Sequence, residues 1–165
     1  MFDFVSPQLL AGQLLIGLIN GSFYAMLSMG LAIIFGLMNV VNFAHGAQYM
    51  LGAFVAWLGL NYLGIPYWGS LISAPIVVGA FGMLLERVIL RPLQHLDHLY
   101  ALLATYALAL IIEGLIRQRY GSTGLPYDSP ITGGLRLDFM FLPWYRLWVV
   151  GFSVVTCIGA WLLIE

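Results

Sequence analysis

The stretch LLAGQLLIGLINGSFYAMLSMGLAIIFGLM, residues 9–38, decides the fold class, because it is almost wholly apolar and has no charged side chain. The charge-free region is longer still and runs from Phe4 to Leu85. A helix needs about 20 apolar residues to cross the hydrocarbon core of a bilayer. The region is therefore long enough for three crossings. Each should be helical, because lipid cannot hydrogen-bond exposed peptide groups.

The composition of the whole chain agrees with a membrane protein. Hydrophobic residues make up 62% of the 165 residues and charged residues 8%, whereas soluble domains are about a quarter charged. The net charge of −1 and the absence of lysine exclude a basic nucleic-acid-binding surface. A single cysteine, Cys157, excludes a disulfide scaffold. Disorder is excluded because polar, charge-rich segments are lacking.

Glycine, proline and polar residues divide the apolar sequence into segments. They predict an all-α polytopic membrane protein with about five transmembrane helices. Pro92 disfavours helix at the residue before it and predicts that the chain leaves the membrane there. The predicted spans are about 9–29, 47–60, 69–85, 99–116 and 147–165, with a polar break at 36–46.

The segment between the last two spans, 120–145, differs in kind and is predicted to be an extramembrane loop. Glycines and prolines interrupt its first part, and apolar side chains then alternate with Arg136, Asp138 and Met140. A period of two is typical of a strand. The alternation predicts a short extramembrane β-like segment near 134–142, lying on the membrane surface.

The polar break leads into NVVNFAHGAQ, residues 39–48, the most unusual part of the chain. Amides and imidazoles are costly in lipid and usually face a bundle interior or a water-filled path. If the helix is broken here, free backbone groups could bind a polar substrate. Alternatively, the polar side chains cap helix ends and join neighbouring helices. His45 is either a proton relay or a packed neutral histidine; no second ligand is near it in sequence, so no metal site is predicted.

Charged side chains offer two further candidates. Glu86, Arg87 and Arg91 follow the third span and either dock a soluble partner or anchor the topology. Glu113 lies within the fourth span, where it either pairs with Arg117 one turn later or binds a substrate ammonium group. Known catalytic motifs are absent from the sequence, so no catalytic residues are predicted and the chain is not expected to be an enzyme.

The stretches NGSFYAM, residues 20–26, and NFAHGAQYMLGA, residues 42–53, are similar to a known family. Together with Glu86-Arg87 and Arg91-Pro92-Leu93, they resemble the permease subunits of branched-chain amino acid ABC importers, of the Liv-H type. With the polar break, these motifs indicate residues of a translocation path or its gate. The candidates are Asn20, Tyr24, Asn39, Asn42, His45 and Gln48.

The resemblance implies a transporter subunit of the bacterial inner (plasma) membrane that forms the path for leucine, isoleucine and valine. It implies a second related permease, two cytoplasmic ATPases that use ATP and Mg, and an extracytoplasmic binding protein as partners. No cofactor is expected in this chain. Because the family's permeases are nearly twice as long, the chain is expected to be the N-terminal part of a single permease domain.

Orientation and substrate have competing interpretations. Four arginines in the loop after the fourth span, against two after the third, would place that loop and the N-terminus inside the cell. The resemblance implies the opposite orientation, which we adopt as the prediction. Alternative functions are a permease of the same type for urea or short amides, a non-transporting structural or assembly subunit of a membrane complex, and an intramembrane enzyme using His45 or Glu113.

Overall fold

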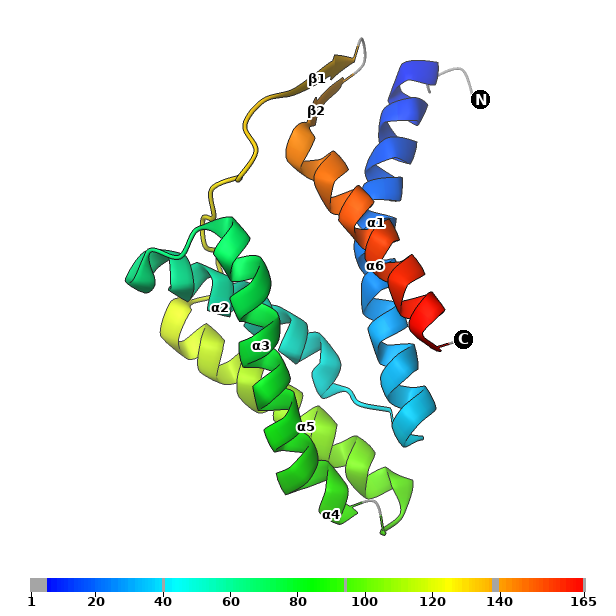
Figure 1. Cartoon of the computed structure of the whole chain (residues 1–165), viewed down its shortest axis with the longest axis vertical. Helices are drawn as coiled ribbons and strands as arrows, with labels where there is room; N and C mark the ends of the chain where they lie inside the picture. The colour runs from blue at the N-terminus through cyan, green and yellow to red at the C-terminus, as the bar shows by residue number, and fades with distance from the viewer. Residues whose placement is uncertain (1–5, 40, 94, 138–139, 165) are drawn as a thin grey trace. The chain divides into compact units, whose positions relative to one another are not determined.

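The computed structural model describes residues 6–39, 41–93, 95–137 and 140–164. It is almost entirely helical, with one small β-hairpin (Figure 1). The prediction of an all-α fold with a short β segment is thereby confirmed. The elements are α1 (Pro7–Met38), α2 (Ala44–Leu63), α3 (Tyr67–Leu85), the π-helical segment η1 (Glu86–Leu90), α4 (Arg91–Leu93), α5 (His98–Tyr120), β1 (Gly134–Leu137), β2 (Met140–Pro143) and α6 (Trp144–Ile164).

Within the described residues, four helical runs are long and apolar enough to cross a membrane. They are 7–37, 67–93, 98–120 and 144–163. The remaining predicted span, 47–60, falls in α2, which has 20 residues but is outside that set. His45, Gln48 and Asn61 lower its hydropathy. The chain has the helices of a multi-pass membrane protein.

Helix α1 is longer than the sequence suggests. Its 32 residues continue to Met38, whereas the first span was expected to end near residue 29 and the polar break to begin at 36. At 1.5 Å per residue the helix is about 48 Å long, against a hydrocarbon core of about 30 Å. Glycines such as Gly30 and Gly36 weaken a helix without ending it, and the first residue with a non-helical backbone is Asn39.

The prediction that the helix stops ahead of Pro92 is wrong. Arg91 has helical dihedrals, φ −60° and ψ −43°, and the helical run continues through α4. The π turn of η1 explains how. The N–H of Arg91 donates to the carbonyl of Glu86, five residues back instead of four. The backbone hydrogen bonds have therefore already left the α-helical pattern at the point where Pro92 lacks an N–H.

The described chain divides into two compact units. One comprises 31–127, with the end of α1 and α2 to α5. Its helices α2 and α3 form an antiparallel pair, joined through Gly64, which has φ 65° and donates its N–H to the Gly59 carbonyl. Positive φ favours glycine, which ends helices in this way. Helix α5 runs parallel to α2, as two ring contacts show: Phe43 packs on Tyr106 near the start of both helices, and Trp57 packs on Tyr120 near their ends.

The second unit comprises residues up to 30 and from 128, with the hairpin and α6. The segment that looked like one surface strand is two antiparallel strands, with Leu135 opposite Leu142. Asp138 and Phe139 lie outside the described residues. The N–H of Trp144 donates to the Gly133 carbonyl at 3.2 Å, so α6 starts directly from the hairpin, three residues before the predicted start at 147.

Candidate functional site

The break between α1 and α2 begins with a left-handed residue. Asn39 has φ 53°, and its N–H donates to the Phe35 carbonyl at 2.8 Å. Among residues with a Cβ, asparagine is one of the few that enter this region at modest cost. The side chain of Asn39 is exposed. The local chemistry of this one residue therefore turns the chain out of α1.

The start of α2 is closed by hydrogen bonds from within the protein. Asn42 is 7% exposed, and its Oδ1 accepts from the N–H of Ala44 at 3.0 Å. The Asn42 carbonyl accepts from the N–H of His45 at 3.2 Å. The remaining N–H, that of Phe43, donates to Thr105 Oγ1 on α5 at 3.2 Å. Three consecutive donors at a helix start, where orphan N–H groups are normal, are thus paired, and Asn42 caps α2.

Apart from Asn39, the candidate path residues fall into two sets. Asn42, His45 and Gln48 lie together at the start of α2, the first buried and the other two half-buried. Asn20 and Tyr24 lie on α1, one turn apart and both exposed, in the part of the chain that belongs to the other compact unit. The local cluster at the start of α2 is therefore the candidate site that the structure describes in detail.

Helix α3 approaches this cluster through small residues. A Cβ built on Gly82 would lie 3.8 Å from Gln48 Nε2, and one on Gly52 would lie 3.9 Å from Val78 Cγ2. Gln48 is thus opposite Gly82, and one turn further along α2 Gly52 is opposite Val78, as expected for antiparallel helices. Continued by one turn, the same register puts Glu86 at the level of Ala44. The start of α2 and the beginning of η1 thus lie at the same end of this helix pair.

The candidate docking residues all lie on this extension of α3. Glu86 is half-buried, whereas Arg87 and Arg91 are exposed. Glu86 and Arg87 are in η1 and Arg91 opens α4. Single π turns in helices are frequent at functional sites. Because Arg87 and Arg91 are exposed, their guanidinium groups are available to a partner or to lipid headgroups.

Three buried hydroxyl residues escaped the sequence analysis. One of them, Ser153, is 1% exposed and donates to the Val149 carbonyl within its own helix. Thr105 is 1% exposed and joins α5 to α2, and Ser70 is 3% exposed with its Oγ facing Gly59. Ser70 Oγ has no hydrogen-bond partner in the described part of the protein. The available signal was a hydroxyl residue between alanines at a spacing of four, since Ala101 and Ala109 flank Thr105. Nothing local indicated which backbone it would meet.

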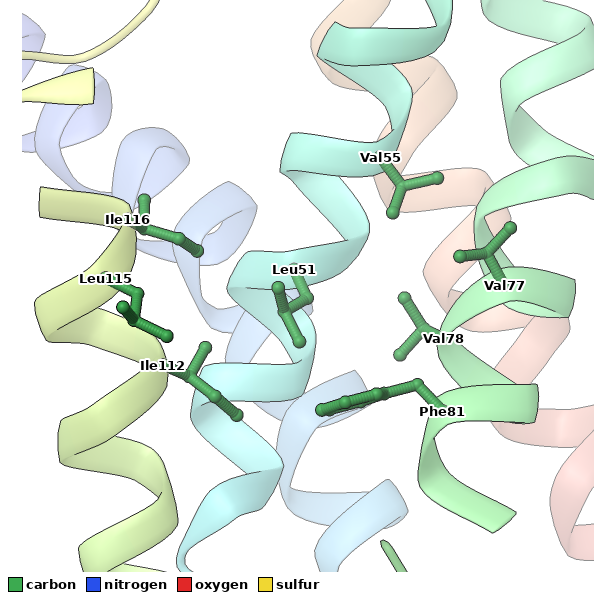
Figure 2. A pocket seen from close by; sticks show the side chains of 8 residues that line it. All are labelled: Leu51, Val55, Val77, Val78, Phe81, Ile112, Leu115 and Ile116. Carbon is green, nitrogen blue, oxygen red and sulfur yellow. The ribbon is translucent and has the colours of Figure 1, made fainter. Parts of the chain in front are cut away.

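An apolar groove of about 310 Å³ lies between α2, α3 and α5 (Figure 2). Every lining side chain is aliphatic or phenylalanine. A groove of this kind can hold aliphatic groups, but it offers nothing to the ammonium or carboxylate of an amino acid. The lining residues are Leu51, Val55, Val77, Val78, Phe81, Ile112, Leu115 and Ile116.

Ionisable groups elsewhere are scattered. Glu113 and Arg117 are both exposed on α5, and His95 and His98 are exposed near its start. In the ranges that the structure describes, no three His, Cys, Asp or Glu side chains gather closely enough to hold a metal ion. The polar chemistry is therefore concentrated at the start of α2.

The left-handed backbone of Asn39 leads to a first prediction. Asn39→Val should lower the free energy of unfolding by about 1–2 kcal/mol, because a β-branched residue is strained at positive φ. Asn39→Gly keeps the turn and should be as stable as the parent. Thermal unfolding of the detergent-purified protein compares the three. Equal melting temperatures for the valine and glycine variants would contradict the prediction.

Comparison with known proteins shows which sequences this chain is similar to. Residues 13–165 match the family described as "Branched-chain amino acid transport system / permease component". The high-affinity branched-chain amino acid transport system permease protein LivH of Salmonella typhimurium is 30% identical over 129 residues, covering 73% of this chain and 42% of that protein.

Further relatives agree with this match. LivH of Escherichia coli K12 is 28% identical over 149 residues, which cover 86% of this chain and 44% of the relative. The permease protein BraD of Pseudomonas aeruginosa is 30% identical over 112 residues, 63% of this chain and 36% of the relative. No solved structure matches. The matches cover less than half of each relative's length.

Proposed function

Because the chain belongs to the family of permease components of branched-chain amino acid transport systems, we propose that it forms part of the translocation path of an ATP-driven importer for leucine, isoleucine and valine. It is a multi-pass protein of the inner (plasma) membrane. The observation that carries the proposal is the family match, which extends from residue 13 to residue 165.

The physical character of the chain supports this role. A path for aliphatic amino acids needs few fixed charges, and Phe4 to Leu85 has none. Buried polar groups in membrane proteins usually line a path or join helices. The cluster of Asn42, His45 and Gln48 at an interrupted helix has the character of such a path. We propose that Asn20, Tyr24 and Asn39 also belong to the translocation path or its gate.

The proposed partners follow from the type of system. Two cytoplasmic ATPases would hydrolyse ATP with Mg, so the permease itself has no enzymatic activity and no cofactor. A second related permease would complete the path, and an extracytoplasmic binding protein would deliver the substrate. Glu86, Arg87 and Arg91 are proposed to dock a partner. In this arrangement the N-terminus and the β-hairpin lie outside the cell. ATP hydrolysis drives the change between inward and outward states, which differ in their contacts with the substrate.

The experiment that tests the function starts from the permease purified in mild detergent with whatever co-purifies. In vesicles, the assembly with ATP and its binding protein should accumulate labelled leucine. Excess isoleucine or valine should compete, and urea should not. Competition by urea alone would assign the substrate to short amides. Absence of any ATPase from the purified assembly would favour the structural or assembly-subunit alternative.

The role of His45 gives a second prediction. His45→Ala should lower leucine uptake per assembled complex about tenfold, the equivalent of one lost hydrogen bond in the path. His95→Ala, which changes an exposed histidine, is the matched control and should leave uptake unchanged. Loss of assembly in His45→Ala would indicate a packing role instead, and unchanged uptake would remove His45 from the path.

A further inference from the structure

Thr105 links two segments that are far apart in sequence. Its Oγ1 accepts a hydrogen bond from the N–H of Phe43 at 3.2 Å and donates one to the Leu102 carbonyl at 3.0 Å. The second bond fixes the hydroxyl on α5, so that its lone pairs face the start of α2. Thr105 is 1% exposed, so its hydroxyl is buried between the helices.

The start of α2 does not take this acceptor from its own nearest polar side chain. Asn42 Oδ1 is already used by the N–H of Ala44. Ala44 and Asn42 are 1% and 7% exposed, so a donor at Phe43 without a partner would be costly in these surroundings. The acceptor comes instead from α5, 62 residues later.

Neighbouring residues on α5 shape the contact. Ala101 and Ala109, one turn on each side of Thr105, are 2% and 8% exposed. Small side chains there let α2 come close, as is usual between membrane helices. Tyr106 packs edge-on against the ring of Phe43 with centroids 6.2 Å apart. A hydrogen bond and a ring contact thus hold the same residue of the break.

We propose that Thr105 is a positioning residue of the translocation path. Its hydroxyl holds Phe43, and with it the start of α2, against α5, so that Asn42 and His45 keep their place while the transporter changes state. This inference rests on the proposed transport function. Thr105 itself touches no substrate in this scheme; it acts through the backbone of Phe43.

Transport by the purified assembly tests the proposal. Thr105→Val has nearly the same shape but no acceptor, and it should lower the maximal uptake rate per assembled complex about tenfold with KM for the loaded binding protein unchanged. Thr105→Ser should restore the rate. Thr156→Val is the matched control, because Thr156 on α6 is exposed and donates only within its own helix, to Phe152.

A second readout does not depend on transport. In a Cys157→Ser background, Val41→Cys reports how accessible the break is to a water-soluble thiol reagent in native membranes. Thr105→Val should speed its alkylation about tenfold and Thr105→Ser should not. Thr105→Ala replaces the valine variant if the latter fails to assemble.

The outcomes test the positioning role of Thr105 separately from the proposed transport function. Unchanged turnover per assembled complex in Thr105→Val, with only less complex formed, would overturn the positioning role and leave a purely structural one. Equal alkylation rates in the valine and serine variants would also overturn it. A parent assembly that takes up no leucine would remove the proposed function, while the alkylation comparison still reports on Thr105.

Discussion

Replacing Gly134 with valine is expected to abolish the pairing of β1 with β2. A Cβ at this position would lie 2.5 Å from the Leu142 carbonyl oxygen and 2.6 Å from Phe141 Cζ. Real Cβ atoms do not approach backbone oxygen so closely, and the opposed strand cannot move away without losing its hydrogen bonds. Such overpacking costs about 1–3 kcal/mol or more, and a hairpin of two short strands is marginal on its own.

A disulfide trap measures this effect. Leu135→Cys with Leu142→Cys, in a Cys157→Ser background, places two thiols on directly opposed residues. Opposed residues in antiparallel strands are close enough for a disulfide. Cross-linking should be near complete in the parent and fall to background with Gly134→Val. Gly124→Val is the control, because a Cβ there meets no atom within 4 Å. Full cross-linking in the Gly134 variant would refute the described register.

The second large effect is expected at Gly52, where α2 meets α3. A Cβ there would lie 3.9 Å from Val78 Cγ2, so alanine fits, but leucine would force the helices apart. Gly52→Leu should lower the free energy of unfolding by about 1–3 kcal/mol, and it should also loosen the contact of Gln48 with α3. Gly52→Ala should be close to neutral.

Gly79→Leu provides the matched control for this variant. Gly79 lies on α3 next to Val78, but a Cβ on it meets nothing within 4 Å. Thermal unfolding in one detergent, followed by the fluorescence of the tryptophans, compares the three variants with the parent. If Gly79→Leu destabilised the protein as much as Gly52→Leu, the described packing of α2 on α3 would be incorrect.

The features that could be predicted from the sequence, such as membrane spans and the β segment, depend mainly on local composition. The fourth predicted span, 99–116, lies within α5, and the β-like segment coincides with the hairpin. Hydropathy and residue alternation are properties of neighbouring residues, so they can be recognised without knowing the fold. The same reasoning failed at Pro92, because a local rule about proline was overridden by the π turn that precedes it.

The candidate site was only partly accessible to such reasoning. Asn42 and His45 stood out because polar residues are rare in this chain. Thr105 did not stand out, because its role depends on the hydrogen bond from Phe43, and that bond depends on how α2 and α5 pack. Likewise, a glycine on the contact face, such as Gly52, and one facing open space, such as Gly79, look the same in sequence. Contacts between distant segments are therefore what the structure adds.

The bond between Phe43 and Thr105 also orders events during biosynthesis. The ribosome adds Thr105 62 residues after Phe43, which at about 5–20 residues per second takes roughly 3–12 s. During this interval the start of α2 has its Asn42 cap but lacks its acceptor on α5. The nascent chain must therefore keep that peptide group hydrated, or in contact with the insertion machinery, until α5 has been synthesised. The start of α2 can consequently pack in its final position only after α5 has been synthesised.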